Sequence, residues 1–104
     1  MRLLDGVTVD TTGDWFDVPR FGGRGLWHNT FSVYVWSADF GGGSVYIEVS
    51  PDGDGTNAFT ARRVDETQAI FTLSDVQTVR LRGFKVRARL AGATTPSALT
   101  AMLY

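Results

Sequence analysis

One loop of the sequence, SPDGDGTNAF at residues 50–59, carries side chains that could bind a divalent cation. Asp52, Asp54 and Asn57 offer the carboxylate and amide oxygens that calcium prefers. A calcium loop of the helix–loop–helix type also needs a bidentate glutamate at its twelfth position, which here is Arg63. Asp-Gly pairs are equally typical of turns with positive φ. We therefore predict a hairpin turn and no metal or other cofactor, with a looser site at Asp52, Asp54 and Asn57 as the alternative.

Residues that could act as nucleophile and base are scattered along the chain. The one histidine, His28, precedes an expected strand and is more typical of a surface or interface position than of a triad. Ser50, Ser74 and Ser97 lie in turn-like contexts, and none occupies a Gly-x-Ser-x-Gly elbow. The absence of cysteine excludes a thiolate nucleophile and a thiolate metal site. Nucleophilic hydrolysis therefore has no support.

Four carboxylates could in principle do acid–base chemistry. Asp14 and Asp17 flank a short Trp-Phe segment, and Asp65 and Glu66 lie in an expected turn between strands. Carboxylates in such positions are ordinarily solvated. Together with the missing nucleophile, their placement predicts that the protein is not an enzyme.

Basic side chains alternate with aliphatic ones near the end of the chain, at Arg80, Arg82, Lys85, Arg87 and Arg89. In a strand this alternation turns the cations outward, so we expect all five to line one outer surface. The aliphatic residues between them are expected in the core: Val79, Leu81, Val86, Ala88 and Leu90. Such a surface could bind phosphates or an acidic protein face. Because no exposed aromatics are interleaved for base stacking, we favour a solvated face or a protein contact over nucleic acid.

The tryptophans at positions 15, 27 and 36 raise the possibility of carbohydrate binding, since sugar faces stack on exposed indoles. In a small β domain most tryptophans belong to the core or to an interface. Trp36 shares one face of its expected strand with Tyr34, and apolar residues occupy the other face as well. If nothing within the domain covers the Tyr34 and Trp36 face, it is an interface anchor.

The elements that must position these residues are all strands. Two-residue alternation recurs along the whole chain, and no stretch shows a sustained apolar period of 3.6 residues. We expect eight or nine short strands, separated by Gly, Pro and Asp, in one antiparallel β-sandwich or jelly roll. The expected strand regions are 6–9, 14–18, 30–40, 44–50, 57–63, 68–73, a segment at 78–90 broken near Gly83, and 98–104. Phe84 is expected in the core.

Composition sets outer limits on the class of protein. A chain of 104 residues with 43% hydrophobic residues and 12 glycines fits a single turn-rich domain, residues 1–104. The net charge is −1, but residues 1–52 hold three basic and seven acidic residues, whereas residues 53–104 hold seven basic and four acidic residues. No apolar run is long enough to span a membrane, and the start MRLLDG does not resemble a signal peptide. We expect a soluble protein that does not bind membranes.

The order of several short segments resembles small β-sandwich virion proteins of tailed bacteriophages. The matching pieces are GDWFDV (13–18), SVYIEVSPDG (44–53), the following Phe59, FKVRARLAG (84–92) and a final short alternating strand. This sequence departs from that pattern in its longer Asp-Gly-Asp-Gly loop and in a Phe where Trp is commoner. By the resemblance, turn positions would be Ser50, Asp52 and Gly53, and Arg87 and Arg89 would lie on the penultimate strand. The resemblance implies a non-enzymatic role in the virion.

We therefore expect a capsid decoration or cement subunit, assembled in the host cytoplasm, that binds the major capsid protein or other virion proteins and forms a homo-oligomer. The alternative is a carbohydrate- or receptor-binding module of a phage tail or fibre. The expected contact residues are Tyr34, Trp36, Arg80, Arg82, Arg87, Arg89 and Tyr104.

Overall fold

The computed structural model describes residues 1–18, 30–52 and 56–103. Within these ranges the chain forms strands and no helix, so no described segment is a helix that could cross a membrane. The strands are β1 (Arg2–Val7), β2 (Thr11–Thr12), β3 (Phe16–Asp17), β4 (Thr30–Trp36), β5 (Ser44–Ser50), β6 (Phe59–Thr60), β7 (Arg62–Arg63), β8 (Ile70–Phe71), β9 (Asp75–Arg80), β10 (Lys85–Ala91) and β11 (Leu99–Leu103).

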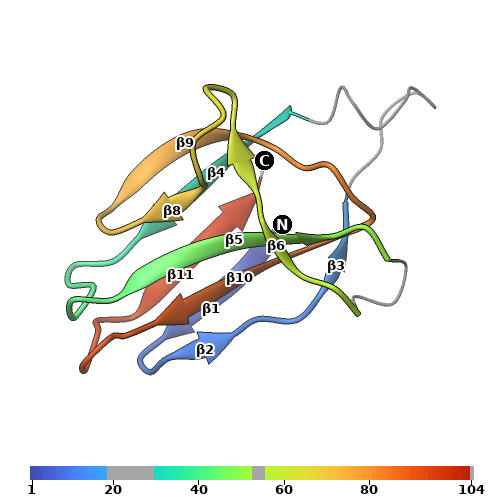
Figure 1. Cartoon of the computed structure of the whole chain (residues 1–104). Coiled ribbons are helices and arrows are strands. Elements are labelled where there is room, and N and C mark those ends of the chain that lie inside the picture. The colour runs from blue at the N-terminus through green and yellow to red at the C-terminus, as the bar shows by residue number, and fades with distance from the viewer. Residues whose placement is uncertain (19–29, 53–55, 104) are drawn as a thin grey trace.

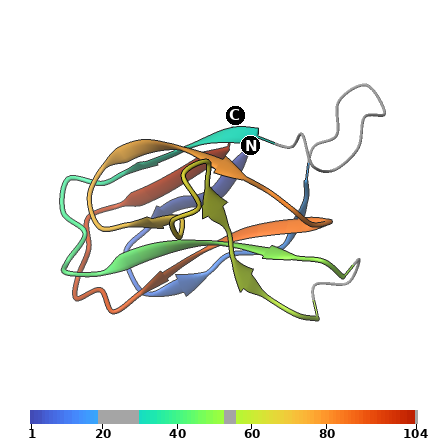
Figure 2. The same ribbon diagram turned by 45° about the horizontal axis from the view of Figure 1, so that its top comes forward.

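These strands make two antiparallel sheets that pack face to face (Figure 1). Sheet A has the order β1-β11-β4-β9-β7. Sheet B has the order β2-β10-β5-β6, with β3 also paired to β10 and β8 also paired to β5. The two layers separate clearly in Figure 2, where cyan β4 and orange β9 lie above green β5. The predicted fold class, an all-β antiparallel sandwich, is confirmed.

The chain has more strands than the alternation predicts, because five of the described strands contain only two residues. A two-residue strand is too short to show a period, and pairing with a longer neighbour is what defines it. Strands β2 and β3 both pair with β10, and β6 and β8 both pair with β5. The long strands β5 and β10 therefore organise sheet B, and the short strands line its edges.

Residues 57–63, which we predict as one strand, are divided between the two sheets. Strand β6 pairs with β5 in sheet B, and β7 pairs with β9 in sheet A. Figure 1 shows this segment rising from beside β5 towards β9. Ala61, between β6 and β7, is buried and donates its backbone N–H to the Ile47 carbonyl oxygen at 2.7 Å. The segment therefore covers one side of the sandwich and links its layers.

The core lies between the sheets and is built by alternate residues of the long strands. Phe31, Val33 and Val35 of β4 are buried, as their alternation predicts. Burying a side chain of this size stabilises the fold by about 1.5–3 kcal/mol relative to leaving it exposed. The largest fully buried apolar side chains are Val33, Val35, Val45, Ile47, Phe71, Val79, Leu81, Val86, Leu90 and Leu99.

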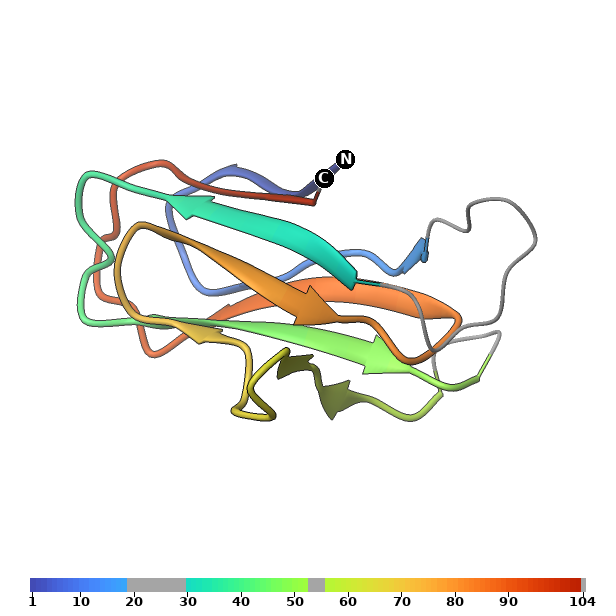
Figure 3. The ribbon, with the colours of Figure 1, turned by 90° about the horizontal axis from the view of Figure 1, so that it is seen from above.

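The first and last described strands lie side by side in sheet A. Strand β1 pairs with β11 through two register shifts, and the Leu103 N–H donates to the Met1 carbonyl oxygen at 2.8 Å. The start of β1 and the end of β11 therefore lie side by side (Figure 3). Leu103 is buried, and Tyr104 lies outside the described residues.

The connection from β4 to β5 crosses between the sheets through a turn at Phe40–Gly43. The Gly43 N–H donates to the Phe40 carbonyl oxygen at 3.0 Å, and Gly41 and Gly42 have φ of +62° and +76°. Positive φ at both central positions is the geometry that favours glycine. A Cβ on Gly41 would overlap the Thr94 carbonyl oxygen, whereas a Cβ on Gly42 would meet nothing within 4 Å.

The two glycines therefore provide a matched pair of substitutions. We expect Gly42→Ala to lower the free energy of unfolding by about 1 kcal/mol, the cost of positive φ alone. Gly41→Ala should lower it by at least about 1 kcal/mol more, because the new methyl group collides with backbone. Urea denaturation of the two variants and the parent chain measures the difference. Equal losses would contradict the close approach of Gly41 to Thr94.

Candidate functional site

The predicted basic surface is divided between the two outer faces of the sandwich. Arg80 ends β9 and Arg82 follows it on the sheet A side, whereas Lys85, Arg87 and Arg89 belong to β10 of sheet B. Their aliphatic neighbours face the core as predicted. The prediction that all five cations line one surface is wrong, because the chain passes from one sheet to the other between β9 and β10.

That crossing occurs at Gly83, which lies against the end of β5. A Cβ on Gly83 would be 2.6 Å from the Ser50 carbonyl oxygen, and the next residue, Phe84, donates its N–H to the same oxygen at 2.9 Å. Phe84 itself is exposed, so its predicted place in the core is wrong. It belongs to the connection rather than to a paired strand, and alternation does not determine the direction of its side chain.

On the outer face of sheet B, Glu48 lies between two arginines of the neighbouring strand. Its Oε1 accepts from Arg87 Nε at 2.8 Å and its Oε2 accepts from Arg89 Nε at 3.3 Å. The Glu48 side chain is only 10% exposed, although it points away from the core. Burial of a carboxylate requires charged or hydrogen-bonding partners, and the two guanidinium groups provide them.

Aromatic rings also stack on the same two arginines. The Arg87 guanidinium lies 4.3 Å from the centroid of the Trp15 ring, and that of Arg89 lies 4.5 Å from the Tyr46 ring. Strand register explains the arrangement, since Arg87 lies opposite Glu48 and Arg89 lies opposite Tyr46 in the β5–β10 ladder. We call Trp15, Tyr46, Glu48, Arg87 and Arg89 the arginine ladder. It orders two side chains that would otherwise be mobile.

Beside the ladder, Lys85 pairs with one of the carboxylates considered for acid–base chemistry. Its Nζ lies 2.6 Å from Asp17 Oδ1. Asp14, the other carboxylate of that segment, is exposed. Asp65 and Glu66 lie on the turn between β7 and β8, so the two pairs of carboxylates come from separate places in the fold.

On the sheet A side, Glu66 holds the other two cations of the predicted surface. Its Oε1 lies 2.9 Å from Arg80 Nη1 and 3.4 Å from Arg82 Nη2. The Glu66 backbone has a φ of +70°, which is unusual for a residue with a side chain. Its neighbour Asp65 accepts from the Thr67 hydroxyl at 2.5 Å, and this bond, followed by the Thr67 backbone N–H, lowers the pKa of the Asp65 carboxyl.

The outer face of sheet A carries a row of apolar side chains. Trp36 is 49% exposed and Val76 is 55% exposed, and Tyr34 and Met102 are partly buried beside them. Register brings them together, because Tyr34 lies opposite Val76 on one neighbouring strand and opposite Met102 on the other. We call these four residues the aromatic patch. Among the described residues Trp36 and Val76 are its most exposed members.

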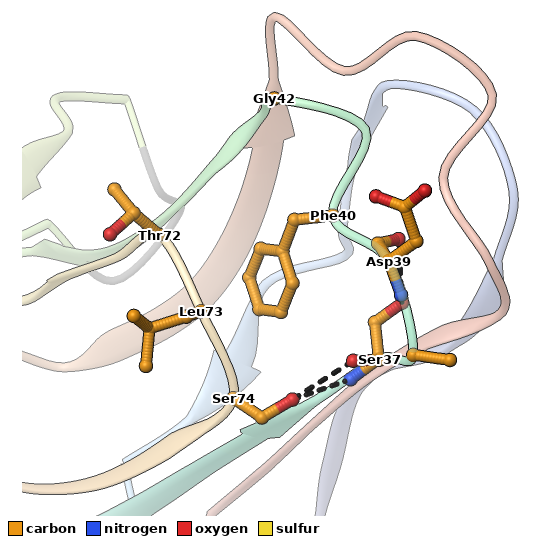
Figure 4. A pocket seen from close by; sticks show the side chains of 8 residues that line it. Ser37, Asp39, Phe40, Gly42, Thr72, Leu73 and Ser74 are labelled. Atoms are coloured by element: carbon orange, nitrogen blue, oxygen red, sulfur yellow. Dashed lines mark hydrogen bonds between the residues drawn. The ribbon is translucent and has the colours of Figure 1, made fainter.

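A hollow of about 530 Å³ opens at one end of the sandwich, between the β4–β5 connection and the segment before β9 (Figure 4). Phe40, Leu73, Ser37 and Ser74 line it. The Ser74 hydroxyl donates to the Ser37 carbonyl oxygen at 3.0 Å and accepts from the Ser37 N–H at 3.1 Å. Ser74 therefore ties the two segments together, as the dashed lines in Figure 4 show. Among the described residues that line the hollow there is no His, Lys or Arg that could activate the Ser74 hydroxyl.

The Asp/Gly loop connects β5 to β6, which pair as the predicted hairpin. Asp52 Oδ2 accepts from the backbone N–H and the side-chain amide of Asn57, at 3.0 and 2.7 Å. The described residues contain no group of three or more His, Cys, Asp or Glu side chains that could hold a metal ion. Asp54, like Trp27, His28 and Tyr104, lies outside the described residues.

The structure thus brings Tyr34 and Trp36 together on sheet A, and Arg87 and Arg89 together on sheet B. The sequence pattern does not identify Glu48, Tyr46 and Trp15 as the partners of Arg87 and Arg89. Alternation predicts the outward position of Glu48, but it does not predict the burial of its side chain. Only the register of β5 against β10 identifies the residues that cover it.

These two outer faces are the candidate interaction sites of the chain. Comparisons with protein-family models, with curated proteins and with solved structures find no match for it. The charge, shape and exposure of the two faces therefore carry the inference about function.

Removing the central carboxylate tests the arginine ladder. We expect Glu48→Ala to lower the free energy of unfolding by about 2 kcal/mol, because two ordered guanidinium groups lose their shared counter-charge. The control Asp5→Ala removes the carboxylate of the exposed Arg2–Asp5 pair and should cost less than about 0.5 kcal/mol. Urea denaturation checks both, and a neutral Glu48→Ala would contradict the ladder.

A second prediction concerns pH. Because the pKa of Asp65 is lowered in the folded state, its contribution to stability is present above the unfolded pKa and is lost as pH falls through the folded value. Thr67→Val removes the hydroxyl donor and should raise the pKa of Asp65. A ¹³C NMR titration of the carboxyl group measures this, with Thr60→Val as the control that leaves the Asp65 titration unchanged.

Proposed function

We propose that this protein is a non-enzymatic structural protein that binds a repeating protein surface through the aromatic patch of sheet A. The observation that carries the proposal is the exposure of Trp36 and Val76 side by side with Tyr34 on a regular sheet face. Trp and Tyr supply large contact areas with few rotatable bonds, and they are enriched among the residues that dominate binding energy. Exposed apolar groups gathered in one place are typical of interaction sites.

The form of the surface suits a contact with another folded protein. The patch lies on paired strands β11, β4 and β9, so its backbone is held by two ladders. A preordered surface loses little conformational freedom on binding. When many copies bind a symmetric particle, the modest energy of each contact is multiplied by the repeat.

The virion setting of the proposal comes from the resemblance in sequence to small β-sandwich virion proteins. Within that setting, a capsid decoration or cement subunit agrees with a small sandwich that exposes an apolar face. The partner is then the major capsid protein or another virion protein, and copies of the subunit occupy equivalent positions.

A carbohydrate- or receptor-binding module is the second candidate, and the half-exposed indole of Trp36 favours it. A sugar ring could stack on that indole next to Tyr34. Binding to a glycan array that is lost with Trp36→Ser would support this candidate over decoration. Loss of glycan binding in EDTA would indicate that this binding also requires a divalent cation.

We expect the double substitution Trp36→Ser with Val76→Thr to weaken association with particles at least about tenfold, because it removes the most exposed apolar area of the patch. Virus particles are produced from a phage genome that lacks the gene for this chain, and purified protein is added to them. The number of copies bound per particle is measured after sedimentation. Phe59→Ser is the matched control, since Phe59 is similarly exposed but belongs to β6 of sheet B.

Both variants should keep the stability of the parent chain, because the substituted side chains are exposed. Saturable binding by the parent chain and the control, with loss in the double variant, supports the proposal. Failure of the parent chain to bind particles would overturn the virion role, and equal binding by all three proteins would remove the aromatic patch from the contact.

A further inference from the structure

We propose that the arginine ladder on the outer face of sheet B is a second binding surface, and that it takes an extended acidic segment of another polypeptide. The two sheets present opposite outer faces, so this surface is separate from the aromatic patch. The inference goes beyond the proposed function and does not depend on the contact made by sheet A.

The hydrogen-bonding capacity of the ladder is only partly used. Arg87 and Arg89 each give their Nε–H to Glu48. Among the described residues neither guanidinium group makes a hydrogen bond through its terminal nitrogens. An arginine has five N–H donors, so each of these side chains retains two terminal NH₂ groups that can bind a carboxylate through paired bonds.

The charge of the surface favours an anionic partner. Lys85, Arg87 and Arg89 contribute three positive charges, and Glu48 and Asp17 contribute two negative charges, so these five side chains together carry one net positive charge. The whole chain has a net charge of −1. Glu48 neutralises one guanidinium group but orders both.

Preorganisation adds to the charge. Trp15 and Tyr46 stack on the two guanidinium groups, and the side chains of Arg87 and Arg89 are only 21% and 34% exposed. A ligand therefore meets donors that already have their bound orientation, and little side-chain entropy is lost on binding.

The spacing of the two arginines selects an extended segment. They occupy alternate positions of β10, about 6.6 Å apart along the strand. Alternate side chains of any extended polypeptide have the same spacing and point to the same side. Acidic residues at positions i and i+2 of a partner can therefore each reach one guanidinium group.

A nucleic acid fits this surface less well. The aromatic faces against which bases could stack are occupied by the guanidinium groups of Arg87 and Arg89. A carboxylate ligand needs no ring face and can bind the arginines from the solvent side.

The test uses two synthetic peptides of the same composition and charge, titrated into the full ¹⁵N-labelled chain and followed by NMR. In acetyl-Ser-Glu-Ser-Glu-Ser-Glu-Ser-amide the acids alternate and share one side when extended. In acetyl-Glu-Ser-Ser-Glu-Ser-Ser-Glu-amide consecutive acids point to opposite sides. We expect the alternating peptide to bind at least about threefold more tightly, with shifts confined to β5, β10 and Trp15, and to weaken at least about tenfold between 50 and 500 mM salt.

Charge-preserving variants separate the guanidinium fork from simple attraction. The double substitution Arg87→Lys with Arg89→Lys should weaken binding of the alternating peptide at least about tenfold, because ammonium groups cannot make paired bonds. The matched control, Arg80→Lys with Arg82→Lys on the sheet A side, should change it less than twofold. If the β10 variant does not fold, the comparison of the two peptides on the parent chain still decides the question.

Equal affinity for the two peptides, or shifts outside sheet B, would overturn the inference. The inference would also be overturned if an oligothymidine of seven nucleotides bound the same residues more tightly than the alternating peptide does. That result would assign the ladder to nucleic acid. The Trp36→Ser with Val76→Thr variant should bind the alternating peptide as the parent chain does. Peptide binding therefore tests the arginine ladder, and particle binding tests the aromatic patch, so either proposal can be overturned without the other.

Discussion

Strands β5 and β10 pair over seven residues, and every pair places two side chains either in the core or on the outer face of sheet B. On the inner side this register aligns Ile47 with Ala88 and Val45 with Leu90, which closes the core against sheet A. On the outer side the same register sets Glu48 against Arg87. A shift of one residue would exchange the two sets and put charge in the core. The short strands of sheet B pair with these two strands, so the layer depends on their alignment.

The same constraint gives the two outer faces different chemistry. Sheet B carries ordered charges on its outer face, where two guanidinium groups bind one carboxylate and stack on aromatic rings. Sheet A exposes the aromatic patch, where Trp36 and Val76 meet solvent with no charged neighbour directly opposite them in the register. A protein with an apolar face on one side and a basic, preordered face on the other could contact two different partners at once. This division agrees with the cementing role proposed for the chain.

Charged side chains in this fold are held in local groups rather than spread over one field. Glu66 gathers Arg80 and Arg82, Asp17 pairs with Lys85, and Glu48 gathers Arg87 and Arg89. Most of these pairs are exposed, and exposed pairs contribute little to stability. The pairs of Glu48 differ because the carboxylate is nearly buried. The ladder is therefore the place where electrostatics affects both the fold and recognition.

Alternation of apolar residues was enough to determine the fold class, the inward positions of β4, β5 and β10, and the break near Gly83. A strand of six or seven residues repeats its period several times, so the side that each of its residues faces can be read along the chain. The outward positions of Tyr34 and Trp36 follow from the same rule. These inferences need no knowledge of which strands are neighbours.

Pairing between distant segments decided the rest. The two-residue strands, the exposed position of Phe84 and the division of the basic residues between two faces depend on which sheet each segment joins. The partners of Glu48 are 39 and 41 residues away along the chain, and the Trp15 ring that stacks on Arg87 comes from the opposite end of the molecule's sequence. Local sequence indicates which side of a strand a residue occupies. Only the tertiary structure decides what covers that side, because cross-strand contacts are set by the register of the whole sheet.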